Sequence, residues 1–135
     1  MQGMKAYDLL VQVETGLVSI SGGKNELGRI GISVCDIGAG MTAHGAILGV
    51  LYRRERSGEG ASLKISLFDM TAEWMAVPLM HNDFGAGPPS WQGLSHPSIA
   101  PYGAYRNCEG TDTVLSIQNE REWQRFCSDI LGKPE

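Results

Sequence analysis

The organisation of this chain depends on the segment 34–41, which reads Val-Cys-Asp-Ile-Gly-Ala-Gly-Met. The stretch 29–35, which ends on the first two residues of this segment, is predicted to be a short strand or an extended segment. From Ile37 to Arg56 apolar residues recur at helical spacing, which predicts a long helix. Arginines at the end of that helix and glycines after it fit a helix C-terminus and an exit turn. Asp36 therefore lies where an extended segment meets a helix.

Two interpretations of Asp36 are open, and they are compatible. As an N-cap, its carboxylate accepts hydrogen bonds from the free N–H groups at the start of the helix. As a nucleophile, the carboxylate is kept ionised by the helix N-terminus, in a glycine-lined site that a substrate carbonyl can approach. One oxygen can cap while the other attacks.

Glycine is unusually frequent, at 18 of 135 residues, against an average share of roughly 7%. Many of these glycines lie with alanines in the helix after Asp36, where small residues let another chain segment approach closely. The run 38–43, Gly-Ala-Gly-Met-Thr-Ala, also fits the dinucleotide fingerprint G-x-G-x-x-G/A. No acidic residue ends a second strand about twenty positions later, as that site requires. Helix packing is the better explanation, and dinucleotide binding is a distant alternative.

The rest of the chain predicts short mixed elements. A short helix around 9–18 opens it, and residues 61–67 alternate like a strand. Ser66 has capping-box spacing and begins a second helix that Pro78 disturbs. Residues 82–100 form a long irregular connection of the kind that is functional or a linker. A hairpin of 102–106 with 113–118 follows, and then a last helix capped by Asn119.

Composition excludes several classes of function. An apolar share of 42% with 19% charged residues indicates a foldable chain, and a net charge of −4 argues against nucleic-acid binding. The cysteines are too widely spaced for a zinc knuckle or a disulfide scaffold, and the histidines are isolated, so no metal site is expected. The N-terminus has no signal-peptide pattern, and no apolar stretch is judged long enough to span a membrane. We expect a cytoplasmic protein. The cysteines are Cys35, Cys108 and Cys127, and the histidines are His44, His81 and His96.

Several blocks of the chain resemble the family III CoA-transferases, the CaiB/BaiF group that includes formyl-CoA transferase. The central block is 34–41, which continues through 53–60 and then 63–69. Upstream, 7–12 and 14–17 fit the preceding block of the family. Downstream, 96–103 and 117–123 fit the start of its smaller domain. These ordered blocks cover nearly the whole chain, although no single hexamer is diagnostic.

The resemblance implies an α/β fold, which in this segment is α+β, with helices and a few short strands. Residues 1–81 would belong to the C-terminal part of the Rossmann-like large domain. Residues 82–100 would be a linker and active-site loop, and 101–135 would begin the small domain with a hairpin and a helix. The chain would be a central fragment, lacking the N-terminal Rossmann-like portion and the rest of the C-terminal part. Because family members form interlocked dimers, we expect a homo-oligomer.

The resemblance also implies a reaction in which Asp36 is the nucleophile. It would attack an acyl-CoA thioester, pass through an aspartyl anhydride and an aspartyl-CoA thioester, and transfer CoA to a carboxylic acid. Coenzyme A would be a substrate, with no permanently bound cofactor and no nucleic-acid or membrane partner. The family's CoA-contacting stretch falls on Lys5, Ala6, Tyr7 and Asp8. The residues near the substrate would be Gly38, Gly40, Gly93 and His96.

Two alternatives accompany this interpretation. Related racemases have an acid/base histidine upstream, and the matching position here is about Ala6. The second base of a two-base racemase is therefore absent, so CoA transfer is favoured over racemisation. The runner-up is a catalytically inactive fragment that acts as an oligomerising or binding module.

Overall fold

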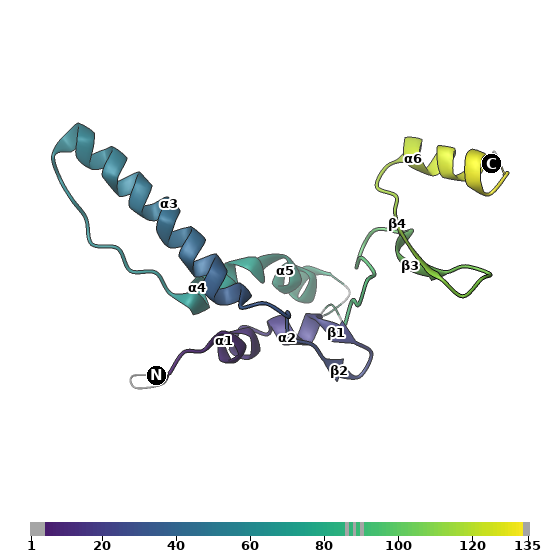
Figure 1. Cartoon of the computed structure of the whole chain (residues 1–135), viewed down its shortest axis with the longest axis horizontal. Helices are drawn as coiled ribbons and strands as arrows, with labels where there is room; N and C mark the ends of the chain where they lie inside the picture. Colours follow the sequence, from purple (N-terminus) through teal and green to yellow (C-terminus); the bar gives the residue numbers. More distant parts are fainter. Residues whose placement is uncertain (1–4, 86, 88, 90, 134–135) are drawn as a thin grey trace. The chain divides into compact units, whose positions relative to one another are not determined.

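The computed structural model describes residues 5–85, 87, 89 and 91–133. The chain divides into two compact units, Met1–Trp91 and Gln92–Glu135, and Figure 1 shows their elements in sequence colours. Six helices, one π-helical segment and four short strands are present in the described part. This is the mixed class of helices and short strands that the sequence predicts.

The first unit opens with two short helices, α1 (Asp8–Glu14) and α2 (Leu17–Ile20). The sequence predicts one helix here, and Gly16 interrupts it because its φ of 80° is left-handed. Glycine adopts that conformation without the steric cost that a side chain brings. The small buried core of this unit draws on both helices and on the start of α3; its apolar members are Val11, Leu17, Val18, Cys35 and Ala39.

A two-stranded hairpin follows, which the sequence analysis does not predict. Strand β1 (Gly22–Gly23) pairs antiparallel with β2 (Glu26–Leu27), and Asn25 between them has a φ of 67°. The stretch 29–35 is neither a strand nor a continuous extended segment, because 31 and 32 form a bend and 34 and 35 already belong to the following helix. The predicted strand at 61–67 is wrong, because 59–66 have no strand partner in the described chain and 67 already begins a helix.

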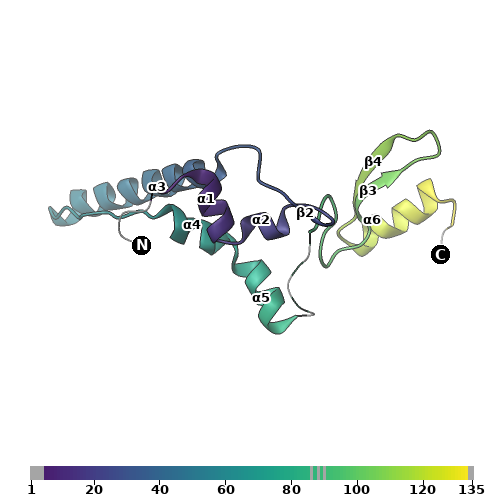
Figure 2. The same ribbon diagram turned by 90° about the horizontal axis from the view of Figure 1, so that it is seen from below.

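Helix α3 (Val34–Ser57) is the longest element, with 24 residues. It begins three residues before the predicted start, and Gly58 ends it with a φ of 73°. Its first turns lie against α1 and α4, while its later turns extend away from both helices (Figures 1 and 2). Most side chains of those later turns are exposed, including Leu48, Leu51 and Tyr52.

By length and composition alone, α3 is long and apolar enough to cross a membrane, because an 18-residue stretch within it has a mean hydropathy of 1.4. This stretch is interrupted by polar residues such as His44, so the expectation that no uninterrupted apolar stretch reaches that length is not contradicted. A single helix of this kind is weak evidence for a membrane span, since the core helix of a soluble protein passes the same test.

Two helices complete the first unit, α4 (Leu67–Trp74) and α5 (Ala76–Phe84). The predicted cap of α4 is confirmed, because the Ser66 hydroxyl accepts a hydrogen bond of 3.1 Å from the N–H of Asp69. The helical path is broken at Met75, three residues before Pro78. The predicted irregular connection begins only at 85, since 82–84 are still helical.

The second unit contains the predicted hairpin and final helix. Strand β3 (Tyr102–Arg106) pairs antiparallel with β4 (Asp112–Ser116), with Ala104 opposite Val114. Helix α6 (Glu120–Arg125) continues into the π-helical segment η1 (Phe126–Ile130). The predicted cap is confirmed, because Asn119 Oδ1 accepts a hydrogen bond of 3.0 Å from the N–H of Glu122.

Candidate active site at the start of helix α3

The N-terminus of α3 is capped by a residue from another helix. Its own N-cap, Ser33, makes no side-chain capping bond. Instead, the backbone N–H of Cys35 donates a hydrogen bond of 2.8 Å to Oδ1 of Asp8, which lies 27 positions earlier and is only 8% exposed. The interpretation of Asp36 as the N-cap is therefore wrong: a carboxylate does cap the helix, but it belongs to Asp8.

A fully buried glutamine extends this contact. The side-chain amide of Gln12 donates a hydrogen bond of 2.6 Å to Oδ2 of Asp8, and its Oε1 accepts one of 2.9 Å from the N–H of Ile30. Asp8 and Gln12 stand four residues apart, on one face of α1. The first helix thereby holds both ends of the segment 30–35 that leads into α3.

Asp36 occupies the third position of α3, in its first turn, and its side chain is exposed. Among the described residues, no hydrogen bond or ion pair engages its carboxylate. The positive pole of the helix favours a negative charge at this place. Asp36 is thus an anion at a helix N-terminus, open to solvent and relieved of the capping role by Asp8.

The neighbouring Cys35 is fully buried and chemically shielded. Burial raises the pKa of its thiol, a hydrogen bond with Thr71 opposes that rise, and the negative charges of Asp8 and Asp36 add to it. Since the thiolate is the reactive form of cysteine, this thiol stays neutral and unreactive. Of these two neighbouring side chains, the carboxylate of Asp36 is the one exposed to solvent.

The two glycines after Asp36 serve different purposes. Gly38 is buried, and a Cβ there would collide with the indole ring of Trp74 and lie 2.8 Å from Sδ of Met70. Gly38 therefore sets the close approach of α3 to α4, as the small-residue pattern predicts. Gly40 is exposed, and a Cβ added there would meet no atom within 4 Å. Both lie within the helix, without the preceding strand that a dinucleotide fingerprint needs.

Among the predicted CoA-contacting residues, Asp8 is the one that contacts this helix start, through Cys35. Lys5 and Ala6 line a depression of about 310 Å³, whose other walls come from α1 and from Phe68. Tyr7 is 60% exposed and precedes α1 as its N-cap residue. Asp8 differs from these three because its carboxylate is buried and bonded inside the protein. Its bond to Cys35 connects the stretch 5–8 directly to the residue before Asp36.

Gly93 and His96 belong to the second unit. Gly93 has a left-handed φ of 54°. Nδ1 of His96 accepts a hydrogen bond of 3.1 Å from the N–H of Ser98, and its ring lies 5.2 Å from that of Tyr102. These contacts orient the imidazole within its own unit.

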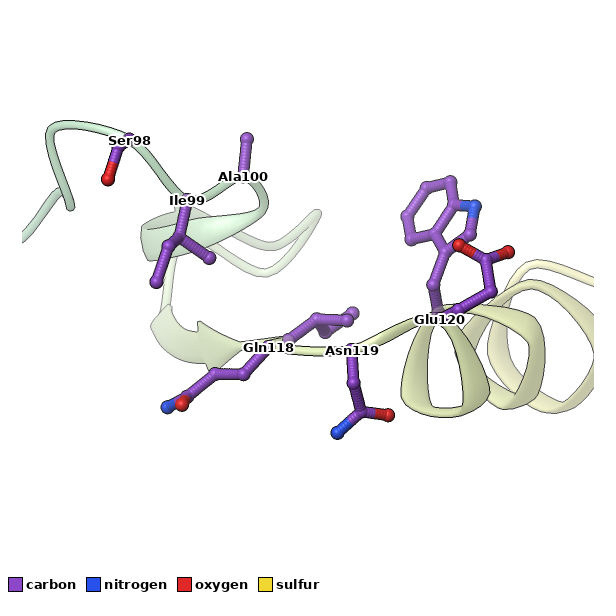
Figure 3. A pocket seen from close by; sticks show the side chains of 8 residues that line it. Ser98, Ile99, Ala100, Gln118, Asn119 and Glu120 are labelled. Atoms are coloured by element: carbon purple, nitrogen blue, oxygen red, sulfur yellow. The ribbon is translucent and has the colours of Figure 1, made fainter.

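An open depression of about 430 Å³ is close to His96 in sequence, and Figure 3 shows its walls. The loop 98–100 lies on one side, and the residues leading into α6 lie on the other. It is lined by Ser98, Ile99, Ala100, Ile117, Gln118, Asn119, Glu120 and Trp123. Neither His96 nor Gly93 lines it.

The sequence analysis missed Gln12 and the capping role of Asp8. The signal was present, since an aspartate followed four residues later by glutamine can hydrogen-bond along one helix face. Nothing local indicates that the pair reaches Ile30 and Cys35. No cluster of three or more potential metal ligands occurs among the described residues.

The whole chain, residues 1–135, matches the family model described as CoA-transferase family III. The chain belongs to this family. This confirms the resemblance drawn from the blocks around Asp36.

Individual CoA-transferases are similar along nearly the whole chain. A succinate–glutarate CoA-transferase of Agrobacterium fabrum is 32% identical over 127 residues, which are 93% of this chain and 31% of that protein. An acetyl-CoA:oxalate CoA-transferase of Acetobacter aceti is 30% identical over 132 residues, or 96% of this chain and 33% of that protein. The chain therefore spans about a third of the length of these relatives.

A solved structure shares the fold. A CaiB/BaiF family protein from Brucella suis matches with a TM-score of 0.72 and 27% identity, over 96% of this chain and 34% of that protein. The fold of this segment is therefore that of a CaiB/BaiF family protein, in agreement with the family model.

Proposed function

We propose that this chain carries the nucleophilic carboxylate, Asp36, of an enzyme that transfers CoA between carboxylic acids. The observation that carries the proposal is the state of Asp36: it is exposed in the first turn of α3, and its carboxylate is free of partners among the described residues. The N–H of Cys35 at this helix start is bonded by Asp8, so neither oxygen of Asp36 is used for capping. Membership of CoA-transferase family III supports a thioester as the electrophile.

The proposed chemistry begins with attack on the acyl donor. A carboxylate oxygen of Asp36 bonds to the carbonyl carbon of an acyl-CoA, the carbon–sulfur bond breaks, and CoA leaves as its thiolate. The thiolate then attacks the γ-carbonyl carbon of the anhydride, which releases the donor acid as a carboxylate and leaves an aspartyl-CoA thioester. Backbone N–H groups near a helix N-terminus are suited to stabilise the oxyanions formed at each step.

The second half returns Asp36 to its starting state. The acceptor carboxylate attacks the aspartyl-CoA thioester, which again releases the CoA thiolate and forms a second anhydride. The thiolate attacks the acceptor's acyl carbon in this anhydride, giving the new acyl-CoA and the free Asp36 carboxylate. Splitting one transfer into small covalent steps is the usual advantage of nucleophilic catalysis. No permanently bound cofactor takes part in this scheme.

Coenzyme A is proposed to bind along the stretch 5–8, through Lys5, Ala6, Tyr7 and only the backbone of Asp8, and Lys5 supplies a positive charge beside an apolar depression. Succinyl-CoA and acetyl-CoA are the donors to test first, because similar proteins are named for succinate–glutarate and acetyl-CoA–oxalate transfer. We further propose a cytoplasmic homo-oligomer in which α3 is a core helix. Gly93 and His96 are proposed to contact the substrate.

The deciding experiment traps the covalent intermediate. The protein is incubated with succinyl-CoA or acetyl-CoA and treated with hydroxylamine, which converts an aspartyl anhydride or thioester into a stable hydroxamate. Peptide mass spectrometry is expected to find the hydroxamate at Asp36. Asp69 is a matched internal control, since it is also an exposed aspartate at the third position of a helix. Equal modification of both, or of neither, would contradict the proposal.

One observation favours the alternative of a binding module without catalysis. Large apolar side chains along α3, among them Met41 at 72% exposure, have no cover in the described chain. Such a surface is typical of an interface. If calorimetry detects no CoA binding while light scattering shows self-association, the binding module becomes the better account.

A further inference from the structure

Asp8 and Gln12 are polar side chains buried between α1 and the start of α3. Asp8 is 8% exposed and Gln12 is fully buried, and both have hydrogen-bond partners. Burying a charged carboxylate is costly unless its oxygens are bonded. Burying Asp8 and Gln12 costs free energy, which suggests that these side chains do more than fill space in the core.

The network has one consistent assignment of donors and acceptors. The N–H groups of Ile30 and Cys35 can only donate, so they require oxygen from Gln12 and Asp8 respectively. This orients the Gln12 amide with its Nε2 toward the carboxylate of Asp8, at 2.6 Å. An ionised Asp8, which only accepts, completes the chain of three bonds.

We propose that Asp8 and Gln12 are positioning residues that fix the first turn of α3 and thereby aim the Asp36 carboxylate. This inference rests on the proposed function of Asp36. Asp8 acts through the N–H of Cys35, the residue next to Asp36, and Gln12 anchors Ile30 at the other end of the incoming segment. Because both oxygens of Asp8 are used inside the protein, its side chain positions the nucleophile and is not a ligand of CoA.

Geometry is the reason such a pair matters for the reaction. A nucleophile must be held close to its attack position, and a displacement of about 1 Å can cost roughly 100-fold in rate. Ser33 provides no side-chain cap. Without Asp8, the first turn of α3 would be free to fray, and Asp36 lies in that turn.

The test exchanges the donor and acceptor roles of the pair. In Asp8→Asn, the new amide must present its oxygen to Cys35, so its NH₂ faces the NH₂ of Gln12. Rotating the Gln12 amide only moves the conflict to the N–H of Ile30. The double variant Asp8→Asn with Gln12→Glu removes it, because the new asparagine donates to the new glutamate, whose second oxygen accepts from Ile30. All three hydrogen bonds and the net charge are then preserved.

Two measurements are made on the wild-type chain, Asp8→Asn, the double variant and Asp69→Asn. The first is hydrogen exchange of the Ile30 and Cys35 amides, and the second is the rate of hydroxamate formation at Asp36 with saturating succinyl-CoA. In Asp8→Asn we expect the amides to exchange at least about 10-fold faster and labelling to slow by roughly 10- to 100-fold, with the Kd for CoA unchanged. The double variant should recover both values, and Asp69→Asn should match the wild type.

Each other outcome has a definite meaning. Unchanged protection of Cys35 in Asp8→Asn, or unchanged labelling despite faster exchange, would overturn the inference. So would a folded double variant that still labels slowly. If Asp8→Asn does not fold, the double variant is the test: labelling at the wild-type rate supports the inference, and slowed labelling overturns it. If the wild type is never labelled, the proposed function fails, and the exchange measurement alone decides whether the pair holds the start of α3.

Discussion

Trp74 lies against Gly38 so closely that a single methyl group on the glycine would collide with its indole ring. This contact joins α3 to α4 close after the candidate nucleophile. Gly40, two residues further along the same helix, faces open space. The two glycines therefore form a matched pair for measuring what the close approach contributes.

We predict that Gly38→Ala and Gly40→Ala change stability in opposite directions. At Gly40 the gain in helix propensity is up to about 1 kcal/mol. At Gly38 the same gain is outweighed by displacement of Trp74 and Met70, since overpacking a core costs about 1–3 kcal/mol. Urea unfolding followed by circular dichroism measures both variants. Equal stabilisation by both would contradict the packing role of Gly38.

Because the thiol of Cys35 is buried, we predict that the free energy of unfolding depends on pH in the alkaline range. Its pKa is raised, chiefly by burial, so the folded state holds the thiol proton at pH values where the unfolded state has lost it. The contribution of Cys35 is complete below the ordinary thiol pKa of about 8.5 and declines as the pH rises toward the raised value. The free energy of unfolding should therefore fall as the pH rises from about 8.

The control for this prediction is Cys35→Ala, compared with the wild type at each pH. The variant should be less stable at neutral pH because of the cavity, by about 1 kcal/mol or more, yet its stability should decline less as the pH rises. Iodoacetamide should modify the exposed Cys108 well before the buried Cys35. Parallel pH profiles for the two proteins, or early modification of Cys35, would contradict the shielding of this thiol.

Local signals in the sequence predicted the elements that local interactions determine. Ser66 and Asn119 cap the helices that follow them, and each cap is a bond to an N–H three residues away. The start of α3 could not be found in this way, because its capping carboxylate is supplied by Asp8, 27 positions earlier. The alternation of 61–67 resembles a strand, but a strand also needs a partner to receive its backbone hydrogen bonds, and the described chain offers none.

In the candidate site too, local features could be predicted from the sequence, and contacts between distant residues could not. Asp36 could be proposed from the sequence because a carboxylate at the beginning of a glycine-rich helical pattern is visible in the sequence itself. Its freedom from the capping role was not visible, since that depends on a contact between α1 and α3. Gln12 was missed for a similar reason: an uncharged side chain in an apolar helix gives no sign that it bonds to the backbone of Ile30.

At the other end of the chain, Glu122 is predicted to titrate at unusually low pH. Its Oε2 accepts a hydrogen bond of 2.9 Å from the N–H of Gln118. That bond, followed by a side-chain hydrogen bond between the carboxyl and Asn119, lowers the pKa of the Glu122 carboxyl. The stabilisation that Glu122 gives α6 is therefore present above the ordinary glutamate pKa and is lost as the pH falls through the lowered value.

NMR titration of the Glu122 carboxyl carbon measures this pKa directly. We expect a midpoint below the ordinary value of about 4.3 in the wild type. Asn119→Ala removes the cap of α6 and should move the midpoint upward. The matched variant Gln118→Ala keeps the backbone N–H that binds Glu122 and should leave the midpoint low. An ordinary wild-type midpoint, or no change in Asn119→Ala, would contradict the capping arrangement.

The last prediction separates the contribution of Asp36 to catalysis from its contribution to folding. Asp36→Asn removes the proposed nucleophile, and loss of a covalent nucleophile can cost on the order of 10⁶-fold in rate. Because no described residue bonds to this exposed carboxylate, the free energy of unfolding should change by less than about 1 kcal/mol, the usual limit for a charge at a helix N-terminus. Asp69→Asn, at the equivalent position of α4, should alter stability by a similar amount and leave CoA transfer intact. Transfer is followed by chromatography of acyl-CoA species after mixing succinyl-CoA with an acceptor acid. An Asp36→Asn protein that still transfers CoA would show that the nucleophile lies elsewhere. If the variant loses activity because it is largely unfolded, Asp36 has a structural role.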